Sequence, residues 1–275
     1  MDPEVTGRQG GDEGDLDPAV AGVLTRLVAG QRHALGSDHI GTYLFGSAAI
    51  GGFEPGVSDV DTVVLLRSDL TAAQLASVRA LHEDLVHETP EWEDRIEAVY
   101  LSTEALHASL GSEAPAARIS PGEPFHQITV DPRWVLDWYQ LETVGLPIVG
   151  PPVRSVVPHV SRSVYIQAVR AHLLDPAWLE PTDEAGDCCY TILTMCRGLR
   201  TMETGELVRK TEGAAWAAAH MPEHAPIIRG ALMWRSQPKG SQDGELLDEE
   251  TMRRLVLEVQ RRIRDVEWQW EGLQP

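Results

Sequence analysis

Short apolar segments separated by Gly- and Pro-rich connections characterise the first half of the chain. Residues 43–45 and 62–66 are rich in strand-forming side chains, and a Gly- and Pro-rich connection joins them. This pattern predicts two strands linked by a turn. A third segment, residues 95–101, alternates between two faces as a strand does, which predicts a further strand of the same sheet.

Apolar residues at helical spacing predict helices around these strands. Asp17 followed by Pro18 is typical of a helix start, and an apolar stripe continues from there to about residue 36. Thr71 and Gln74 have the spacing of a capping box, which predicts the start of a second helix. A further helix is expected over residues 134–141.

The remaining segments define the domain organisation. Residues 111–131 are rich in Pro, Gly and Ser, and we expect a loop over one edge of the sheet. The segment 150–152, Gly-Pro-Pro, breaks regular structure and is a candidate domain boundary. Beyond residue 158 the spacing is helical apart from a loop at 239–243. The expected helices cover residues 164–173, 184–204, 214–220, 227–234 and 252–268.

We therefore predict an α+β chain with two domains, which 275 residues can accommodate. Residues 17–157 would form an N-terminal domain with a mixed β-sheet flanked by helices. Residues 158–275 would form an all-α helical bundle. Residues 1–16, acidic and rich in Gly, would be a disordered tail.

Composition excludes several classes of protein. No apolar run approaches a membrane span, and the N-terminus resembles neither a signal nor a transit peptide, so we expect a cytoplasmic protein without a membrane partner. Three cysteines within one predicted helix indicate buried free thiols. A net charge of -19 argues against nucleic acid as a partner. The same charge would attract a polycationic substrate, or it serves solubility alone.

The strongest chemical signal lies in the connection between the first two strands. Asp59 and Asp61 are two residues apart at the start of a strand, so both project from one face. Two carboxylates this close favour a divalent metal between them. Gly46 and Ser47, at the end of the preceding strand, would offer backbone N–H groups and a hydroxyl to a phosphate. The alternative is ordinary turn chemistry on a solvated surface.

Glu97 is the second candidate. Two aliphatic neighbours share its face of the predicted strand, and a carboxylate in such a place calls for a reason. Beside an Asp-x-Asp pair it would serve as a metal ligand or as the base that activates an attacking hydroxyl. An edge-strand glutamate that faces water is the alternative.

A polar face on one predicted helix of the second domain is the third candidate. Asp187, Tyr190, Thr194 and Arg197 follow one another along one side of this helix. Asp187 and Arg197 are about 15 Å apart at the helical rise, which would span a cationic group at one end and nucleotide phosphates at the other. Lys210 would add positive charge at the phosphate end. The alternative is a helix face that is merely solvated.

Together these motifs resemble the aminoglycoside nucleotidyltransferases, and most closely the streptomycin/spectinomycin adenylyltransferases. The Gly-Ser, spacer and Asp-x-Asp pattern is that of the DNA polymerase beta-like nucleotidyltransferase superfamily. The resemblance extends from about residue 20 to about residue 265. It includes residues 43–47, 58–61 and 95–97, and the segment from Gly186 to Arg197 is its more specific part.

The resemblance implies an enzyme that transfers AMP from Mg-ATP to a hydroxyl of streptomycin or spectinomycin and confers antibiotic resistance. It implies two Mg²⁺ ions, substrates bound in a cleft between two domains, and a monomer. By position, Asp59 and Asp61 match magnesium ligands; Gly46, Ser47, Arg197 and Lys210 match nucleotide contacts; Glu97 matches the catalytic base; and Trp178, Asp183 and Asp187 match drug contacts. In that family the tryptophan and the first aspartate help to accept both drugs.

The chain departs from the family pattern in three places, and the poorly aligned segment among them leaves the exact acceptor open. The connection between Ser47 and Asp59 is slightly longer than expected, residues 125–134 align poorly with the segment that contacts the drug, and the N-terminal tail is extra. Two other functions therefore stay open. One is adenylylation of another small molecule or of a protein, and the other is a catalytically silent nucleotide-binding regulator.

Overall fold

The chain folds into two compact units that divide between Val160 and Ser161. The structure is a computed structural model that describes residues 16–182, 184–237 and 247–265. Several predictions therefore lie outside the described residues: the tail apart from residue 16, the site residue Asp183, the loop at 239–243, and the last residues of the C-terminal helix. None of the described helices is long and apolar enough to cross a membrane.

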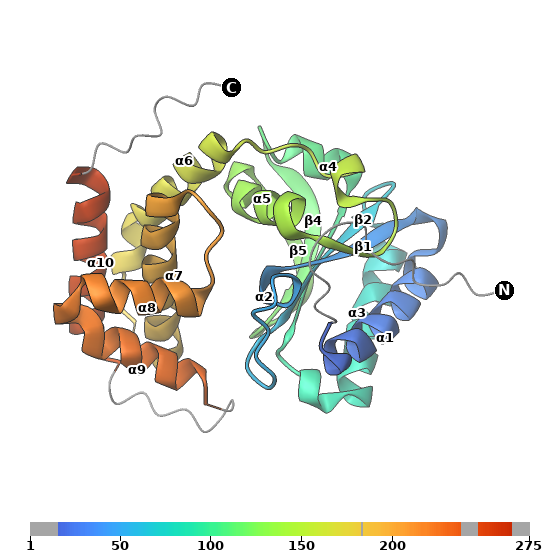
Figure 1. Cartoon of the computed structure of the whole chain (residues 1–275). Helices are drawn as coiled ribbons and strands as arrows, with labels where there is room; N and C mark the ends of the chain where they lie inside the picture. The colour runs from blue at the N-terminus through green and yellow to red at the C-terminus, as the bar shows by residue number, and fades with distance from the viewer. Residues whose placement is uncertain (1–15, 183, 238–246, 266–275) are drawn as a thin grey trace. The chain divides into compact units, whose positions relative to one another are not determined.

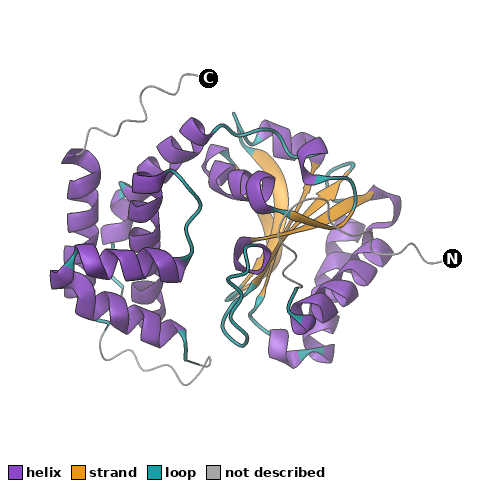
Figure 2. Cartoon of the chain, viewed as in Figure 1, coloured by secondary structure: helices purple, strands orange, loops and turns teal. Residues whose placement is uncertain are grey.

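The first unit contains a six-stranded mixed sheet (Figures 1 and 2). Its strand order is β5-β4-β3-β2-β1-β6, with β2 and β3 parallel and the other neighbours antiparallel. The strands are β1 (His39–Phe45), β2 (Val60–Leu66), β3 (Ile96–Ser102), β4 (Ala114–Ser120), β5 (Glu123–Val130) and β6 (Leu146–Val149). The helices are α1 (Pro18–Leu35), α2 (Gly46–Ala49), α3 (Ala72–Glu88), α4 (Thr103–Ala108) and α5 (Val135–Val144).

Helices α1 and α3 cover one face of this sheet and enclose the main core of the unit (Figure 1). The predicted caps are present: the Asp17 side chain accepts from the Ala19 amide, and Thr71 and Gln74 form the capping box that opens α3. Core side chains from β3 come from Ile96 and alternate residues, so Glu97 belongs to the other face. The amphipathic patterns of both helices were sufficient to place them.

The prediction of a loop over residues 111–131 is wrong. This segment forms β4 and β5, a hairpin at the edge of the sheet that turns at Gly122. Pro115, Pro121 and Pro124 made it resemble a loop. Pro124 lies on the edge strand β5, where one side of the backbone needs no partner, and Pro121 lies in the turn. Pro115 lies before the residues of β4 that pair with β3. The hairpin therefore extends the sheet on the side of β3.

The Gly-Pro-Pro segment at 150–152 belongs to the first unit and is not the boundary. Tyr43 Oη donates to the Pro151 carbonyl at 3.1 Å, which ties the segment to β1. A Cβ on Gly150 would lie 2.7 Å from the Gly41 Cα, so the two backbones touch. The chain divides only at residue 160, and the predicted boundary was residue 157.

The second unit is helical, and its central element is α7 (Ala185–Thr204). Four helices pack against α7: α6 (Arg162–Leu173), α8 (Lys210–His220), α9 (Ala225–Arg235) and α10 (Glu249–Asp265). Helix α7 ends at Gly205, which has a left-handed φ of 67° and caps the helix as its position after the apolar run predicts. The α+β class of the chain is thereby confirmed.

Candidate active site

The chain turns sharply against a carboxylate where β1 ends. Phe45, the last residue of β1, is the register partner of Asp61 on β2. Gly46 follows with a φ of 66°, in the left-handed region that glycine enters readily. A Cβ on Gly46 would lie 1.9 Å from Asp61 Oδ2, so any other residue would collide with the carboxylate. Glycine therefore allows the backbone, with Ser47 next along the chain, to approach Asp61 closely.

Asp61 and Glu97 lie side by side on neighbouring strands. Because β2 and β3 run parallel, the register pairs Asp61 directly with Glu97. Such pairs project from the same face of a sheet, about 5 Å apart at their Cα atoms. Both residues are half-buried, and so is Asp59, which comes just before β2. The fold thus brings the carboxylate of a separate segment beside the Asp-x-Asp pair.

Arg95 holds the segment that leads into Asp59. Its guanidinium is buried and donates from Nε and Nη2 to the Ser58 carbonyl, at 3.2 and 2.7 Å. The Arg95 Cζ lies 4.6 Å from the centroid of the Trp92 ring. Burial lowers the pKa of Arg95, and the neighbouring Asp59 carboxylate opposes this shift. These contacts fix the backbone immediately before Asp59.

The two aspartates suit a magnesium ion. Mg²⁺ prefers oxygen ligands, and it usually takes one or two protein carboxylates together with substrate phosphates and water. In the part of the chain that the structure describes, no group of three or more His, Cys, Asp or Glu side chains could hold a metal ion. Glycine at position 46 keeps the space beside Asp61 Oδ2 clear of a side chain. This donor set fits an ion that is shared with a nucleotide better than a closed protein site.

The β4–β5 hairpin adds a residue that the sequence analysis missed. Arg118 is the register partner of Val99, two residues beyond Glu97, and therefore shares the Glu97 face. Its Nε lies 3.6 Å from Glu97 Oε1. Because the sequence predicted a loop here, it did not indicate which side of the sheet each residue would occupy. Arg118 could therefore not be placed beside Glu97. The run from Phe125 to Val130, rich in aromatic and β-branched residues, is the local signal of the hairpin.

In the helical unit, candidate residues gather around Tyr190. The Tyr190 ring stacks on Trp178, with centroids 6.0 Å apart and planes at 29°, and Lys210 Nζ lies 5.4 Å from the same ring centroid. Trp178 Nε1 donates to the His172 carbonyl at 2.6 Å, which fixes the indole. Tyr190 itself is exposed. The sequence placed Tyr190 on the polar face but gave it no role of its own.

The other predicted residues of this unit have separate surroundings. Asp187 is exposed and accepts a hydrogen bond from Thr182 Oγ1 at 3.0 Å. Arg197 is half-buried near His172: burial lowers the pKa of His172, and the positive charge of Arg197 lowers it further. Asp183 lies outside the described residues.

The prediction of a continuous polar face on α7 is wrong at its centre. Thr194 is only 3% exposed, because the helix is surrounded by its four neighbours and little of its surface reaches solvent. The exposed residues are Asp187 and Tyr190 in the first turns and Glu203 in the last turn. The predicted free, buried thiols are confirmed, and burial raises the pKa of Cys196 to about 12.

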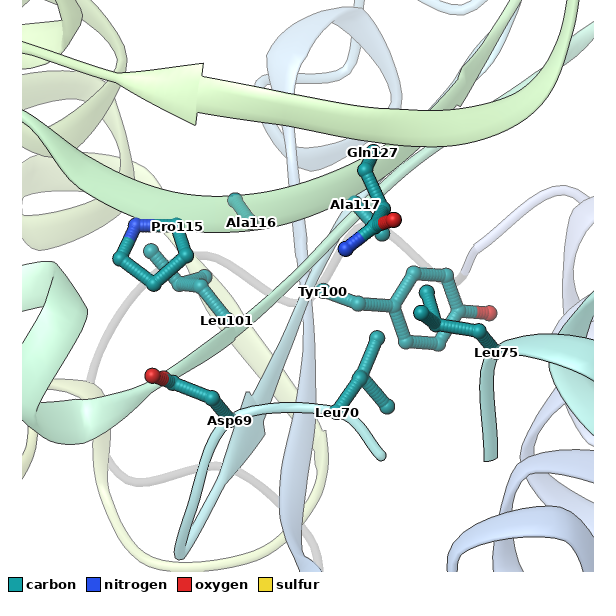
Figure 3. Close-up of a pocket in the computed structure, with 9 residues that line it drawn as sticks. All are labelled: Asp69, Leu70, Leu75, Tyr100, Leu101, Pro115, Ala116, Ala117 and Gln127. Carbon is teal, nitrogen blue, oxygen red and sulfur yellow. The ribbon is translucent and has the colours of Figure 1, made fainter. Parts of the chain in front are cut away.

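A separate small cavity lies at the other end of β2 and β3, away from Asp61 and Glu97 (Figure 3). Its volume is about 40 Å³, far below the ~300 Å³ at which ligand pockets begin. It is therefore no candidate for the nucleotide. Its lining is mostly apolar and comprises Asp69, Leu70, Leu75, Tyr100, Leu101, Pro115, Ala116, Ala117 and Gln127.

Comparisons with known proteins assign both units. A family model described as "Nucleotidyltransferase domain" matches residues 32–102, and one described as "Aminoglycoside adenylyltransferase, C-terminal domain" matches residues 155–261. The first match contains the Gly46 turn, both aspartates and Glu97. The chain is therefore an enzyme of the nucleotidyltransferase class. The pair of domains, in this order, places it in the aminoglycoside adenylyltransferase family.

Individual relatives agree over most of the chain. An aminoglycoside (3'') (9) adenylyltransferase from Escherichia coli is 26% identical over 255 residues, which is 85% of this chain and 94% of that protein. A spectinomycin 9-adenylyltransferase from Staphylococcus aureus is 28% identical over 213 residues, 70% of this chain and 76% of the relative. The crystal structure of spectinomycin adenyltransferase AAD(9) from Enterococcus faecialis with ATP and spectinomycin shares the fold. Its TM-score is 0.69 at 17% identity, over 88% of this chain and 98% of that one.

Proposed function

We propose that this enzyme transfers AMP from ATP to a hydroxyl group of an aminocyclitol or aminoglycoside antibiotic, streptomycin or spectinomycin or both, and releases pyrophosphate. The observation that carries the proposal is the direct pairing of Asp61 with Glu97 beside the Gly46 turn. Metal-binding carboxylates next to a potential base are what adenylyl transfer to a hydroxyl requires. The relatives named above, which include adenylyltransferases for aminoglycosides and spectinomycin, support this choice of acceptor.

In this mechanism Glu97 takes the proton from the acceptor hydroxyl. The hydroxyl oxygen then forms a bond to the α-phosphorus, and the bond from that phosphorus to the bridging oxygen breaks. Pyrophosphate leaves with the electron pair, so atoms and charges balance. Asp59 and Asp61 would hold Mg²⁺, which supplies positive charge against the phosphate oxygens when bound. Ser47 and the backbone of the Gly46 turn would offer donors to the triphosphate.

The helical unit would supply the remaining groups. Arg197 and Lys210 are cations, and we assign them to the pyrophosphate that leaves. Trp178, Asp183 and Asp187 would select the acceptor, whose positive charge suits the two carboxylates. The stacking of Trp178 on Tyr190 supports an aromatic surface in this part of the unit. Because ATP would contact groups of both units, we expect it to strengthen the binding of the antibiotic.

The decisive experiment is to incubate the purified chain with Mg-ATP and a panel of aminoglycosides and aminocyclitols. Mass spectrometry should detect an adenylylated product and an equal amount of pyrophosphate. A parallel reaction with Glu97→Gln serves as the control for contaminating activity. A product found only with a non-antibiotic acceptor would move the proposal to another substrate, and no product with any acceptor would contradict it.

Calorimetry tests the role of ATP in antibiotic binding. The experiment titrates streptomycin, and separately spectinomycin, into the chain with and without a non-hydrolysable ATP analogue and Mg²⁺. We expect binding at least ten times tighter when the nucleotide is present. Equal affinity under both conditions would rule out the coupling while leaving the chemistry unaffected.

A further inference from the structure

Arg118 lies in a row of charged residues on the face of the sheet opposite α1 and α3. The register pairs Asp61 on β2 with Glu97 on β3, and it pairs Arg118 on β4 with Val99, two residues beyond Glu97. Residues two apart on a strand share a face, so Asp61, Glu97 and Arg118 all project to the same side. The sheet itself therefore sets a guanidinium beside the carboxylate that we assign as the base.

Contacts of Nη2 orient the guanidinium. Arg118 Nη2 donates to Ser120 Oγ at 2.6 Å and lies 3.8 Å from Glu123 Oε2. Nε and Nη2 lie along the same edge of the planar group. The hydrogen bond to Ser120 therefore restricts the rotation of this edge, which also carries the Nε that lies near Glu97.

The edge near Glu97 still has a donor to offer. Arg118 Nε is buried and has no hydrogen-bond partner among the described residues, and it lies 3.6 Å from Glu97 Oε1. This separation is that of an ion pair, slightly longer than a hydrogen bond. A small rotation of the Glu97 side chain would shorten the distance between Nε and Oε1 to that of a hydrogen bond. Arg118 would then hold one carboxylate oxygen, and this contact would fix the direction in which the other oxygen points.

We propose that Arg118 is a positioning residue for Glu97, which holds one oxygen of that carboxylate so that the other faces the hydroxyl to be deprotonated. This inference rests on the proposed function, in which Glu97 acts as the base. It predicts that Arg118 affects the rate of the chemical step, because no atom of the nucleotide needs to contact it. The KM for ATP should therefore depend little on this residue.

Kinetics of two substitutions test the proposal. Arg118→Met removes the charge and the donors but keeps a side chain of similar reach, and we expect kcat to fall at least tenfold with the KM for ATP within twofold. Arg118→Lys keeps the charge and should recover part of the loss. Arg26→Met, on α1, breaks an exposed ion pair with Glu88 on α3, and it controls for loss of a surface arginine.

A second control separates orientation of the base from stability of the hairpin. Glu123→Gln removes the charge 3.8 Å from Nη2 but keeps the Nη2 hydrogen bond to Ser120 and the contact between Nε and Glu97. We expect kcat within threefold of the wild type and a melting temperature like that of Arg118→Met. If Glu123→Gln costs as much kcat as Arg118→Met, the effect arises from the hairpin and the proposal is overturned.

Nuclear magnetic resonance gives a readout that does not depend on turnover. The Arg118 Nε–H signal is identified as the one lost in Arg118→Lys, and Glu97→Gln should shift it. An unshifted signal, or a wild-type kcat in Arg118→Met, overturns the proposal while leaving adenylyl transfer intact. A wild-type chain that modifies no acceptor overturns the proposed function and this inference together.

Discussion

The two units hold their candidate residues in different ways. In the sheet unit, Asp61 and Glu97 are neighbours because the register of two parallel strands pairs them, and Gly46 touches Asp61 through its backbone. In the helical unit, Trp178, Tyr190 and Lys210 meet only through their side chains, from three separate elements. Backbone pairing leaves little freedom to adjust. Under the proposed function, the fold therefore fixes the residues of the chemical step, whereas single substitutions can change the residues that select the acceptor.

The largest effect should come from the base itself. Glu97→Gln keeps the shape of the side chain but cannot accept a proton at neutral pH, so kcat should fall by about 10² to 10⁴. ATP binding, measured by calorimetry, should stay within threefold of the wild type. A kcat within a factor of three of the wild type would show that another group is the base.

The backbone contact at Gly46 should be nearly as sensitive. Gly46→Ala would place a methyl group on Asp61 Oδ2 and would strain a φ of 66°, so we expect kcat to fall by about 10² and stability to drop by about 1–3 kcal/mol. Gly56→Ala is the matched control, since Gly56 also has a positive φ but nothing within 4 Å of an added Cβ. Equal losses of activity in both variants would trace the effect to backbone strain.

Acid should destabilise the sheet unit through a buried histidine. His82 is enclosed beneath the sheet and its Nε2 is 2.8 Å from Tyr100 Oη, and burial lowers the pKa of His82 to about 4. The unfolded chain binds this proton near pH 6.5, so stability is full above that pH and is lost as the pH falls toward 4. Between pH 7 and pH 5 the loss due to His82 should be about 2 kcal/mol.

Urea unfolding of the wild type and of His82→Gln measures this loss. Glutamine can keep a hydrogen bond to Tyr100 but does not titrate, so the variant should lose about 2 kcal/mol less than the wild type over the same interval. The unfolding should be followed by amide exchange, which separates the two units. An identical pH dependence in both proteins would show that His82 does not couple folding to pH.

The smallest effects are expected in the helical unit. Tyr190→Ala removes the ring that Trp178 stacks on, and the KM for the antibiotic should rise about threefold to tenfold, with kcat changed less than threefold. Tyr190→Phe keeps the ring and should resemble the wild type. A hundredfold loss of kcat in Tyr190→Ala would contradict the contrast drawn between the two units.

Local patterns in the sequence predicted most of the helices and strands, but they did not predict which elements pack beside one another. The caps at Asp17 and Thr71, the apolar stripes and the alternation around Glu97 identified helices and strands correctly. The hairpin of β4 and β5 was missed because proline at an edge strand looks like proline in a loop. Arg118 was missed with it, since only the pairing of strands tells which residue lies beside Glu97.

The helical unit shows the same limit in another form. A helical wheel distinguishes an apolar side of α7 from a polar side. It cannot show that four other helices surround α7 and bury Thr194. Tyr190 was likewise visible only as one polar position among several. Its importance comes from Trp178, twelve residues earlier, and from Lys210, twenty residues later, whose positions depend on the packing of the whole unit.

The hydrogen bonds from Arg95 to the Ser58 carbonyl also have a practical consequence for protein engineering. Two contacts hold the second half of the connection from Ser47 to Asp59. Arg95 donates a hydrogen bond to the Ser58 carbonyl, and the Phe53 ring packs against the Trp92 ring with 6.3 Å between their centroids. A change in the length of the chain between Phe53 and Ser58 should therefore leave the position of Asp59 unchanged. A short peptide inserted after Gly56, which is exposed, should therefore give a tagged enzyme that still folds and turns over.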